Sequence, residues 1–363
     1  MKTVMMATLL SFPPLVAKAA ESCQVRLILF TPTDVAVPDG YQQRINQIVT
    51  YTESFYQQGL KRWGHTKFVS PFRRTDAGDA EILLVKGQHP KAHYKDATVR
   101  HEAIATAQTQ YQLEDVGLQV WWIMVYIGDP PARFRVFRGA FDPKSGGWSV
   151  CNYDSRQGEI DPRDELGDEL PTALTLKAMI HELGHGFQLP HIGPQLKDES
   201  GNSLMGPTHA SYRRVAGNRE KRVYLTEAAA AMLSTHPAFR GAVDTRGRTL
   251  PRPTVDDLTY SAPRGQQQMI VRGRVRCEVA PKFALVADLS EVQPGEYWTK
   301  TYAGDIAADG TFEVTVTEPA PADGKLIVWF VFANGDHTGD GRQRGRRSGI
   351  EHKYRFVNGH FHP

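Results

Sequence analysis

The sequence of 363 residues has few cysteines, little net charge and, after its first residues, no long apolar run. Positive charges exceed negative charges by only 3. The chain therefore lacks the strong basic character of proteins that bind nucleic acids or anionic membranes, and we expect neither partner. No stretch approaches the roughly 18 unbroken apolar residues of a transmembrane helix. The three cysteines, Cys23, Cys151 and Cys277, permit one disulfide and do not have the spacing of a metal site.

Residues 1–19 have the parts of a secretory signal peptide. Lys2 supplies a positive charge, an apolar run extends over Val4–Val16, and residues 17–19 read AKA, a small-residue cleavage pattern. The apolar run is too short to cross a membrane. We therefore expect the protein to be secreted or periplasmic.

Residues 20–240 alternate between strand-like and helix-like patterns, which predicts a mixed sheet with helices packed against it. The expected strands are Val25–Phe30, Ile82–Val85, Leu118–Ile127 and Gly146–Tyr153, and the expected helices are Tyr41–Leu60, Ala97–Gln112, Pro171–Gly186 and Thr226–Ser234. Cys23 and Cys151 both fall in this region. They are therefore the expected disulfide pair in an oxidising compartment.

The segment AMIHELGHGFQLPH, residues 178–191, contains three histidines at intervals suited to one metal ion. His181 and His185 are four residues apart and so lie one turn apart on the same face of a helix. His191 lies beyond the glycine and proline that end this helix, where the chain can fold back under the metal. Three imidazoles leave the fourth position of a tetrahedral zinc ion for water. Glu182 lies beside the first ligand and is placed to take a proton from that water.

The pattern HELGHGFQLPH resembles that of the metzincin zinc endopeptidases, HExxHxxGxxH followed by a methionine turn. Residues 202–207 read NSLMGP, so that Met205 comes 14 residues after His191. The resemblance implies that the three histidines bind one catalytic zinc ion, that Glu182 is catalytic and that Met205 supports the site from below. It also implies an α+β, metzincin-like zincin fold and hydrolysis of peptide bonds in a protein or peptide substrate.

The sequence departs from the family pattern at two positions. Gln188 stands where the family has a glycine with positive φ, a conformation that costs a residue with a Cβ atom about 1 kcal/mol or more. Either Gln188 accepts this strain, or Gly186 ends the helix early and the turn differs. Pro207 stands where astacins and serralysins place a tyrosine that helps to hold the oxyanion. His209 and Tyr212 lie nearby in the sequence and are candidates to replace it.

Metzincins place an edge strand just before the active-site helix, and Gly146–Tyr153 is the candidate in this chain. An extended peptide can pair with such a strand through backbone hydrogen bonds, in which case Trp148 contacts the substrate. The alternative is an ordinary hairpin strand whose aromatic residues are half-buried.

Three other functions remain open. In a gluzincin the third ligand is a glutamate on a later helix, and Glu220 or Glu227 is available for that role. A secreted binding or adhesion protein that keeps the scaffold but is catalytically weak or inactive is favoured by Gln188 and by the missing tyrosine after Met205, whereas the intact Glu182 argues against it. The third is zinc-dependent hydrolysis of an amide other than a peptide.

Residues 241–257 form a linker that contains proline and arginine, and residues 258–363 have an alternating pattern without any expected helix. The alternation predicts an all-β, immunoglobulin-like sandwich as an accessory domain. Its expected strands are residues 269–279, 283–289, 296–306, 310–319, 325–335 and 352–357.

Two loops of the chain have composition that suits a ligand. One loop contains part of a Ca²⁺-binding pattern, namely Asn334, Asp336, Thr338, Asp340 and Gly341, but lacks the glutamate that closes such a loop. The other contains the acidic residues 159–169, whose spacing matches no recognised Ca²⁺ loop. The arginines that could bind a glycan or polyanion are Arg342, Arg344, Arg346 and Arg347. The alternative is that they belong to a solvated hairpin loop that binds nothing.

We expect the protein to be a monomer.

Overall fold

The computed structural model describes residues 22–363 except 114–117, 130–135, 157–159, 168–172, 196–200, 218–219, 247–250 and 340–348. The expected signal peptide therefore lies outside the described residues. The same is true of Asp340, Gly341 and the four arginines that follow them. None of the helices in the described part of the chain combines the length and apolar character that crossing a membrane requires.

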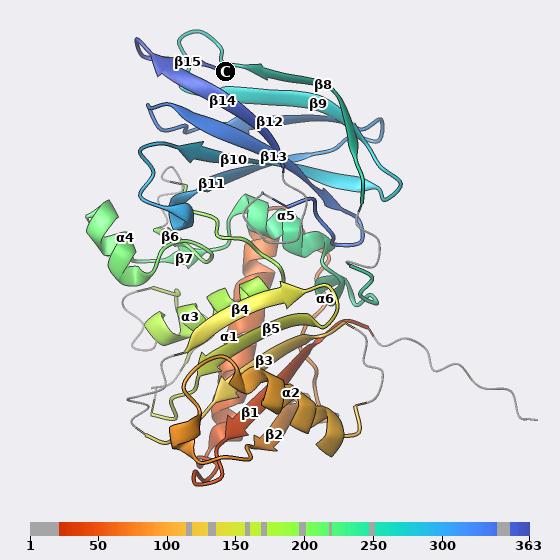
Figure 1. The fold of residues 1–363 in the computed structure, drawn as a ribbon, viewed down its shortest axis with the longest axis vertical. Coiled ribbons are helices and arrows are strands. Elements are labelled where there is room, and N and C mark those ends of the chain that lie inside the picture. Colours follow the sequence, from red (N-terminus) through yellow and green to blue (C-terminus); the bar gives the residue numbers. More distant parts are fainter. Residues whose placement is uncertain are drawn as a thin grey trace, which may run out of the picture.

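The first sheet has five strands in the order β2-β1-β3-β5-β4 (Figure 1). The strands are β1 (Val25–Thr31), β2 (Ile82–Lys86), β3 (Val120–Val125), β4 (Phe137–Asp142) and β5 (Gly146–Asn152). β1, β2, β3 and β5 are parallel, and β4 runs antiparallel to β5. This arrangement confirms the predicted mixed sheet.

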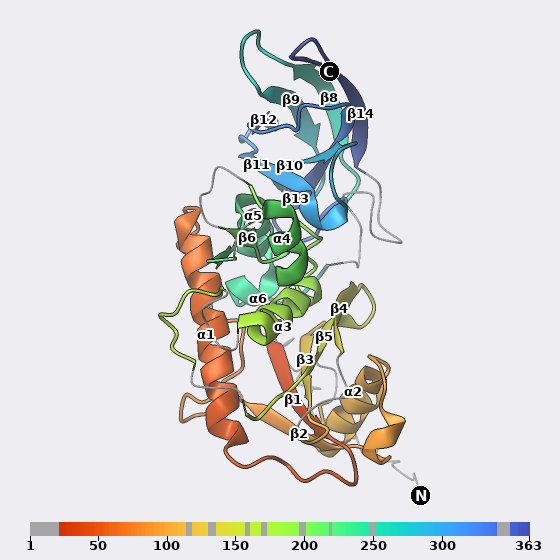
Figure 2. The same ribbon diagram turned by 90° about the vertical axis from the view of Figure 1, so that its left-hand side faces the viewer.

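Helices cover both faces of this sheet (Figure 2), with α1 (Tyr41–Arg62) and α3 (Ala173–Gly186) on one face and α2 (Val99–Gln110) on the other. Side chains alternate along β1, so that Leu27 and Leu29 pack on the α1 side whereas Ile28 and Phe30 pack on the α2 side. A strand that is buried on both faces has a continuous apolar run instead of alternation. This is why β1 and β3 could be predicted from their composition.

The prediction that Gly146–Tyr153 is the edge strand is wrong. β5 pairs with β3 on one side and with β4 on the other, so that β4 is the edge of the sheet. All residues of β5 are buried, whereas those of β4 are partly or fully exposed. The sequence FRGAFD of β4 has neither an apolar run nor regular alternation, which is why the strand was missed.

The expected disulfide between Cys23 and Cys151 does not form, and the three cysteines are free. β3 lies between β1 and β5, and two strand spacings of about 4.8 Å each exceed the Cα separation of about 7 Å that a disulfide can bridge. Both buried thiols have polar contacts instead: Cys23 with Asp244 and Cys151 with the carbonyl group of Ile123.

After α3 the chain forms short elements that pack on the same side of the sheet: β6 (Asn202–Ser203), α4 (His209–Ala216), β7 (Val223–Tyr224), α5 (Glu227–Thr235) and α6 (Pro237–Arg240). The predicted helix at Thr226–Ser234 is confirmed as α5. Thr226 caps it by accepting a hydrogen bond from the backbone N–H of Ala229. β6 and β7 pair in parallel.

The C-terminal part consists of two sheets, one ordered β11-β10-β13-β14-β15 and the other β12-β9-β8. Its strands are β8 (Thr254–Ser261), β9 (Met269–Arg276), β10 (Pro281–Ser290), β11 (Lys300–Asp305), β12 (Thr311–Val316), β13 (Gly324–Phe332), β14 (Ile350–Val357) and β15 (His360–His362). Residues of both sheets contribute to one hydrophobic core. β8 starts inside the segment expected to be a linker.

One predicted strand of the C-terminal part begins too early. Residues 296–306 were expected to be extended, but Glu296–Trp298 form a 3-10 turn, η2, and β11 starts only at Lys300. Gly295 precedes this turn with φ 145°, which favours glycine.

The C-terminal part shares a hydrophobic core with the rest of the chain. Leu285 of β10 and Trp329 and Val331 of β13 belong to the same buried cluster as α5 and α1. Figure 1 shows the strands above α5, in contact with it. The two parts therefore form a continuous apolar interior.

Candidate metal centre

Helix α3 presents one apolar side to the core and the motif residues along another side. Leu176, Met179, Ile180 and Leu183 are buried in the core. This packing fixes the helix against the sheet, so that the rings of His181 and His185 have their centroids 4.8 Å apart.

Gln188 adopts the left-handed backbone conformation, with φ 72°. The sequence left open whether Gln188 is strained or the turn differs from that of the family. The structure shows the strained residue in the place where the family has glycine. The buried side chain compensates, because its Oε1 accepts a hydrogen bond from Arg246 at 3.2 Å. Arg246 is itself fully buried and forms an ion pair with Asp244 at 2.6 Å. The departure from the family glycine is thus accommodated by an arginine from a distant segment.

We expect Gln188→Ala to lower the free energy of unfolding by about 2 kcal/mol, because it removes a buried hydrogen bond from a charged group. Gln188→Gly loses the same bond but removes the left-handed strain, so it should be more stable than the alanine variant by about 1 kcal/mol. Urea denaturation of both variants measures this difference. An alanine variant as stable as the glycine variant would contradict the left-handed conformation.

The turn at Gln188 brings His191 back to the other two histidines. The Nε2 atoms of His185 and His191 are 3.1 Å apart. One ligand nitrogen from each of His181, His185 and His191, the histidine cluster, lies within 4.8 Å of the others, and this is the only such group of potential metal ligands among the described residues.

The second ring nitrogen of each histidine is held by an acceptor. Nδ1 of His181 lies 2.7 Å from the carbonyl oxygen of Leu204, and Nδ1 of His185 lies 2.8 Å from that of Leu189. Nδ1 of His191 lies 3.1 Å from the carboxylate of Glu296. A ring that donates from Nδ1 has its lone pair on Nε2, so these three contacts favour the tautomer that can bind a metal through Nε2.

The cluster fits a zinc ion in donor type and in number. Burial lowers the pKa of His181 well below its usual range, an effect to which the neighbouring His185 adds, and burial also lowers the pKa of His185. Both rings are therefore neutral, as metal ligands must be.

Glu182 is half-buried beside the cluster. Burial raises its pKa to about 7, and a hydrogen bond from the backbone of Gly139 opposes this rise. Gly139 belongs to the edge strand β4 and lies so close to α3 that a Cβ atom there would overlap the carbonyl group of Glu182. The glycine therefore allows the strand to approach and hold the carboxylate.

Met205 lies between α3 and the segment that follows the third histidine. It is buried, and its sulfur packs against Gly184 of α3. Its carbonyl oxygen accepts a hydrogen bond from Ile192 at 3.1 Å, next to the third histidine. Its neighbour Leu204 holds His181, so this turn contacts both ends of the motif.

The structure gives the other sequence candidates contacts with residues outside the histidine cluster. Trp148 is in the core on the α2 side of the sheet, where Arg100 lies 3.8 Å from its ring centroid. His209 forms an ion pair with Glu220 at 3.3 Å. Tyr212 stacks on Trp298 with centroids 6.0 Å apart. Trp148 therefore faces away from α3, and the contacts of His209 and Tyr212 serve to attach α4.

Neither rival glutamate joins the histidine cluster. Glu220 forms a buried ion pair with Lys177 at 2.6 Å, one turn before His181. Glu227 lies in the first turn of α5. His191 is therefore the third ligand that the geometry favours.

Sequence reasoning missed two residues at the cluster, Glu296 and Tyr297. The ring of Tyr297 has its centroid 3.8 Å from that of His191 and is stacked on His181 at 6.3 Å. Both belong to η2, more than 100 residues beyond the motif, in a segment that was predicted as strand. No local pattern marks them.

No family model matches the sequence, and no curated protein matches it. Solved structures do. Wild-type OgpA from Akkermansia muciniphila is 19% identical with a TM-score of 0.69 over 94% of this chain and 96% of that chain. The chain has the fold of OgpA. A catalytically inactive OgpA in complex with an O-glycopeptide (glycodrosocin) substrate is 18% identical, with a TM-score of 0.68 over 94% of this chain and 95% of that chain.

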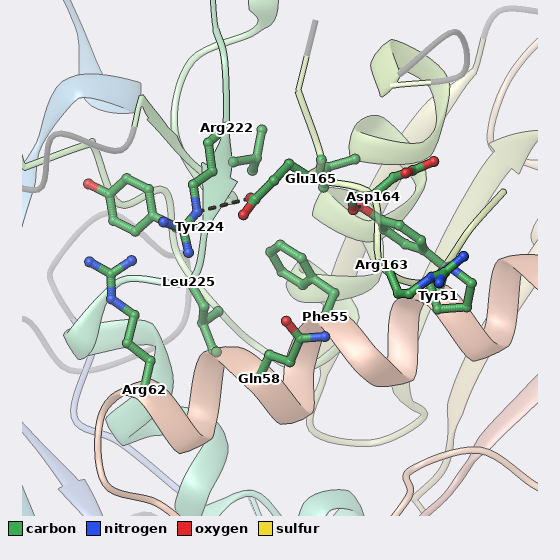
Figure 3. Close-up of a pocket in the computed structure, with 14 residues that line it drawn as sticks. Tyr51, Phe55, Gln58, Arg62, Arg163, Asp164, Glu165, Arg222, Tyr224 and Leu225 are labelled. Atoms are coloured by element: carbon green, nitrogen blue, oxygen red, sulfur yellow. Dashed lines mark hydrogen bonds and ion pairs between the residues drawn. The ribbon is translucent and has the colours of Figure 1, made fainter. Parts of the chain in front are cut away.

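A separate cavity of about 250 Å³ lies between α1 and the segment around β7 (Figure 3). Arg62 and Tyr224 line one end, and Arg222 forms an ion pair with Glu165 at 3.0 Å across it. None of the cluster histidines lines this cavity.

Proposed function

We propose that the protein is a secreted zinc endopeptidase of metzincin type, in which His181, His185 and His191 bind the metal. The observation that carries this proposal is the shared orientation of the three histidines, whose Nδ1 atoms each have an acceptor and whose Nε2 atoms converge. Glu182 beside them supplies the carboxylate that peptide hydrolysis needs.

A bound zinc ion would supply a water molecule of pKa about 7 and would polarise the scissile carbonyl group. Glu182 takes a proton from the attacking water and gives it to the leaving amine. Met205 supports the histidines from below. β4, which is paired on one side only in the described sheet, offers its other side to an extended peptide in place of β5.

O-glycosylated peptides are the substrate class that we propose. The support is the fold shared with OgpA, of which one structure contains an O-glycopeptide substrate. In this proposal residues 1–19 are removed on export, residues 20–240 form the catalytic domain of a monomer, and the strands from Thr254 onward form an immunoglobulin-like sandwich. The arginines at 342–347 remain a proposed contact for an anionic glycan.

The alternative function is that of a binding protein with little or no catalytic activity, and one of the two observations that favoured it no longer does so. Gln188 was a reason to doubt the metal site, but the hydrogen bond from Arg246 holds the turn and His191 reaches the cluster. The missing tyrosine after Met205 is the second observation in its favour.

The test combines metal content with hydrolysis of a matched pair of peptides. We expect about one zinc per chain, loss of activity on chelation and its return with added zinc. A peptide with one O-glycan should be cleaved and the same peptide without it should not. His191→Ala should lose both metal and activity. Full activity of the metal-free chain would disprove the proposal, and equal cleavage of both peptides would disprove only the substrate class.

A further inference from the structure

We propose that the turn Glu296–Trp298 of the C-terminal part is a component of the catalytic centre, in which Glu296 positions His191 and Tyr297 donates a hydrogen bond to the developing oxyanion. This inference rests on the proposed function and extends it. It assigns part of the chemistry to residues that lie far from the motif in the sequence.

Glu296 fixes the ring of His191. Its carboxylate lies 3.1 Å from Nδ1, and this contact directs Nε2 toward the other two histidines. The corresponding atoms of His181 and His185 are held by backbone carbonyl groups of their own domain. A carboxylate in this position fixes the tautomer and makes the imidazole a stronger ligand. Glu296 is thus a positioning residue for the third ligand.

Tyr297 lies over the histidines, on the side open to solvent. The residue is 37% exposed, and its ring is tilted by 33° to that of His191, with centroids 3.8 Å apart. A phenol O–H can donate a hydrogen bond. The contacts of the ring with His191 and His181 place it beside two of the three histidines.

The oxyanion is the partner that suits this donor. When the water oxygen bonds to the carbonyl carbon, Glu182 takes the proton and the carbonyl oxygen becomes negative. The phenol donates a hydrogen bond to that oxygen and keeps its own proton. When the C–N bond breaks, the carbonyl double bond returns and the amine nitrogen takes the proton from Glu182. A donor that meets charge present only in the transition state accelerates the reaction.

The turn is anchored closely enough for this role. The backbone N–H of Gly193, two residues after the third histidine, donates to the carbonyl oxygen of Thr299 at 2.7 Å. A Cβ atom at Gly193 would overlap the backbone of Trp298, so only glycine permits this approach. Trp298 also stacks on Tyr212, parallel within 6°. The turn is therefore held directly after Tyr297 by the segment that follows His191 and by α4, and directly before it by the contact of Glu296 with His191.

The phenol is tested by Tyr297→Phe, which keeps the ring and removes only the hydroxyl group. We expect kcat for a glycopeptide to fall about 100-fold, with KM and zinc affinity changed less than about threefold. A peptide phosphinate, which mimics the tetrahedral oxyanion, should bind more weakly by a comparable factor. The affinity for the intact glycopeptide is measured in the inactive variant Glu182→Gln, which does not cleave it. Adding Tyr297→Phe to this variant should not change that affinity. Tyr260→Phe, which removes a phenol from β8, is the control and should change none of these.

The outcomes separate this inference from the proposed function. If zinc-loaded wild type hydrolyses no peptide, the proposed function is wrong. If wild type is active but Tyr297→Phe keeps its kcat, or loses substrate and phosphinate binding equally, the catalytic role of Tyr297 is wrong and the ring only contacts substrate.

The positioning role of Glu296 is tested without an activity assay. Glu296→Ala should weaken zinc binding about tenfold or more, measured by competition with a chromogenic chelator. Glu296→Gln, whose amide oxygen can still accept from Nδ1, should recover part of this loss. Glu291→Gln, an exposed carboxylate of the same loop, is the control. Unchanged zinc affinity in Glu296→Ala would overturn the role.

Discussion

Glu182→Gln is expected to lower kcat about 1000-fold while the chain keeps its zinc. Glutamine has nearly the same shape and can still meet the edge strand at Gly139, but it cannot take a proton from water. The three histidines are unchanged, and so is the metal affinity. Steady-state kinetics on an O-glycopeptide and elemental analysis of the same sample measure the two quantities.

Glu227→Gln is the matched control, since it removes a carboxylate from α5 and also tests the gluzincin alternative. It should leave zinc content and kcat within about twofold of wild type, the scatter expected of a surface change. Loss of metal in Glu227→Gln would mean that the third ligand is wrongly assigned. A largely active Glu182→Gln would mean that the general base is wrongly assigned.

Lys177→Met is expected to lower the free energy of unfolding by about 3 kcal/mol, because the buried carboxylate of Glu220 loses its lysine and is left with the longer contact to His209. Lys177 lies 2.6 Å from Glu220 and also donates to the carbonyl oxygen of Pro207 at 2.9 Å. It therefore ties α3, one turn before His181, to the chain that follows Met205. Chemical denaturation of the zinc-free protein measures the loss without a contribution from metal binding.

The double variant Lys177→Met/Glu220→Leu should recover much of the loss, because the buried carboxylate is removed together with its lysine. Arg272→Met breaks the exposed pair between Arg272 and Glu313, whose side chains are about half accessible, and should change stability little. If Lys177→Met and Arg272→Met had equal effects, the Lys177 pair would not be buried in solution.

The histidine cluster could be predicted because its geometry is local. Two ligands a helical turn apart need only a helix, and the apolar residues of α3 predict one. The strands β1 and β3 were predictable for a related reason, since burial on both faces produces continuous apolar runs. The strain at Gln188 was one of two alternatives that the motif left open, and its compensation by Arg246 could not be predicted.

The remaining features depend on contacts between distant segments. β4 pairs with β5, and its Gly139 approaches α3. Neither contact can be inferred from the sequence of the strand, FRGAFD. Glu296 and Tyr297 contact His191 although they lie more than 100 residues later in the sequence. They belong to a turn whose sequence, EYW, predicts a strand. His209 and Tyr212 are the candidates to replace the tyrosine after Met205, and their contacts with Glu220 and Trp298 could not be inferred from the sequence.

The core shared by Trp329, Leu285 and α5 has a consequence for how proteins of this architecture can diverge. Trp329 is fully buried, and an interface of that kind resists both hinge motion and exchange of one half for another. Recombination that replaced the C-terminal strands would expose an apolar surface and also remove Glu296 and Tyr297, which lie against His191. New specificities would therefore arise by change within loops, while the two halves are inherited together.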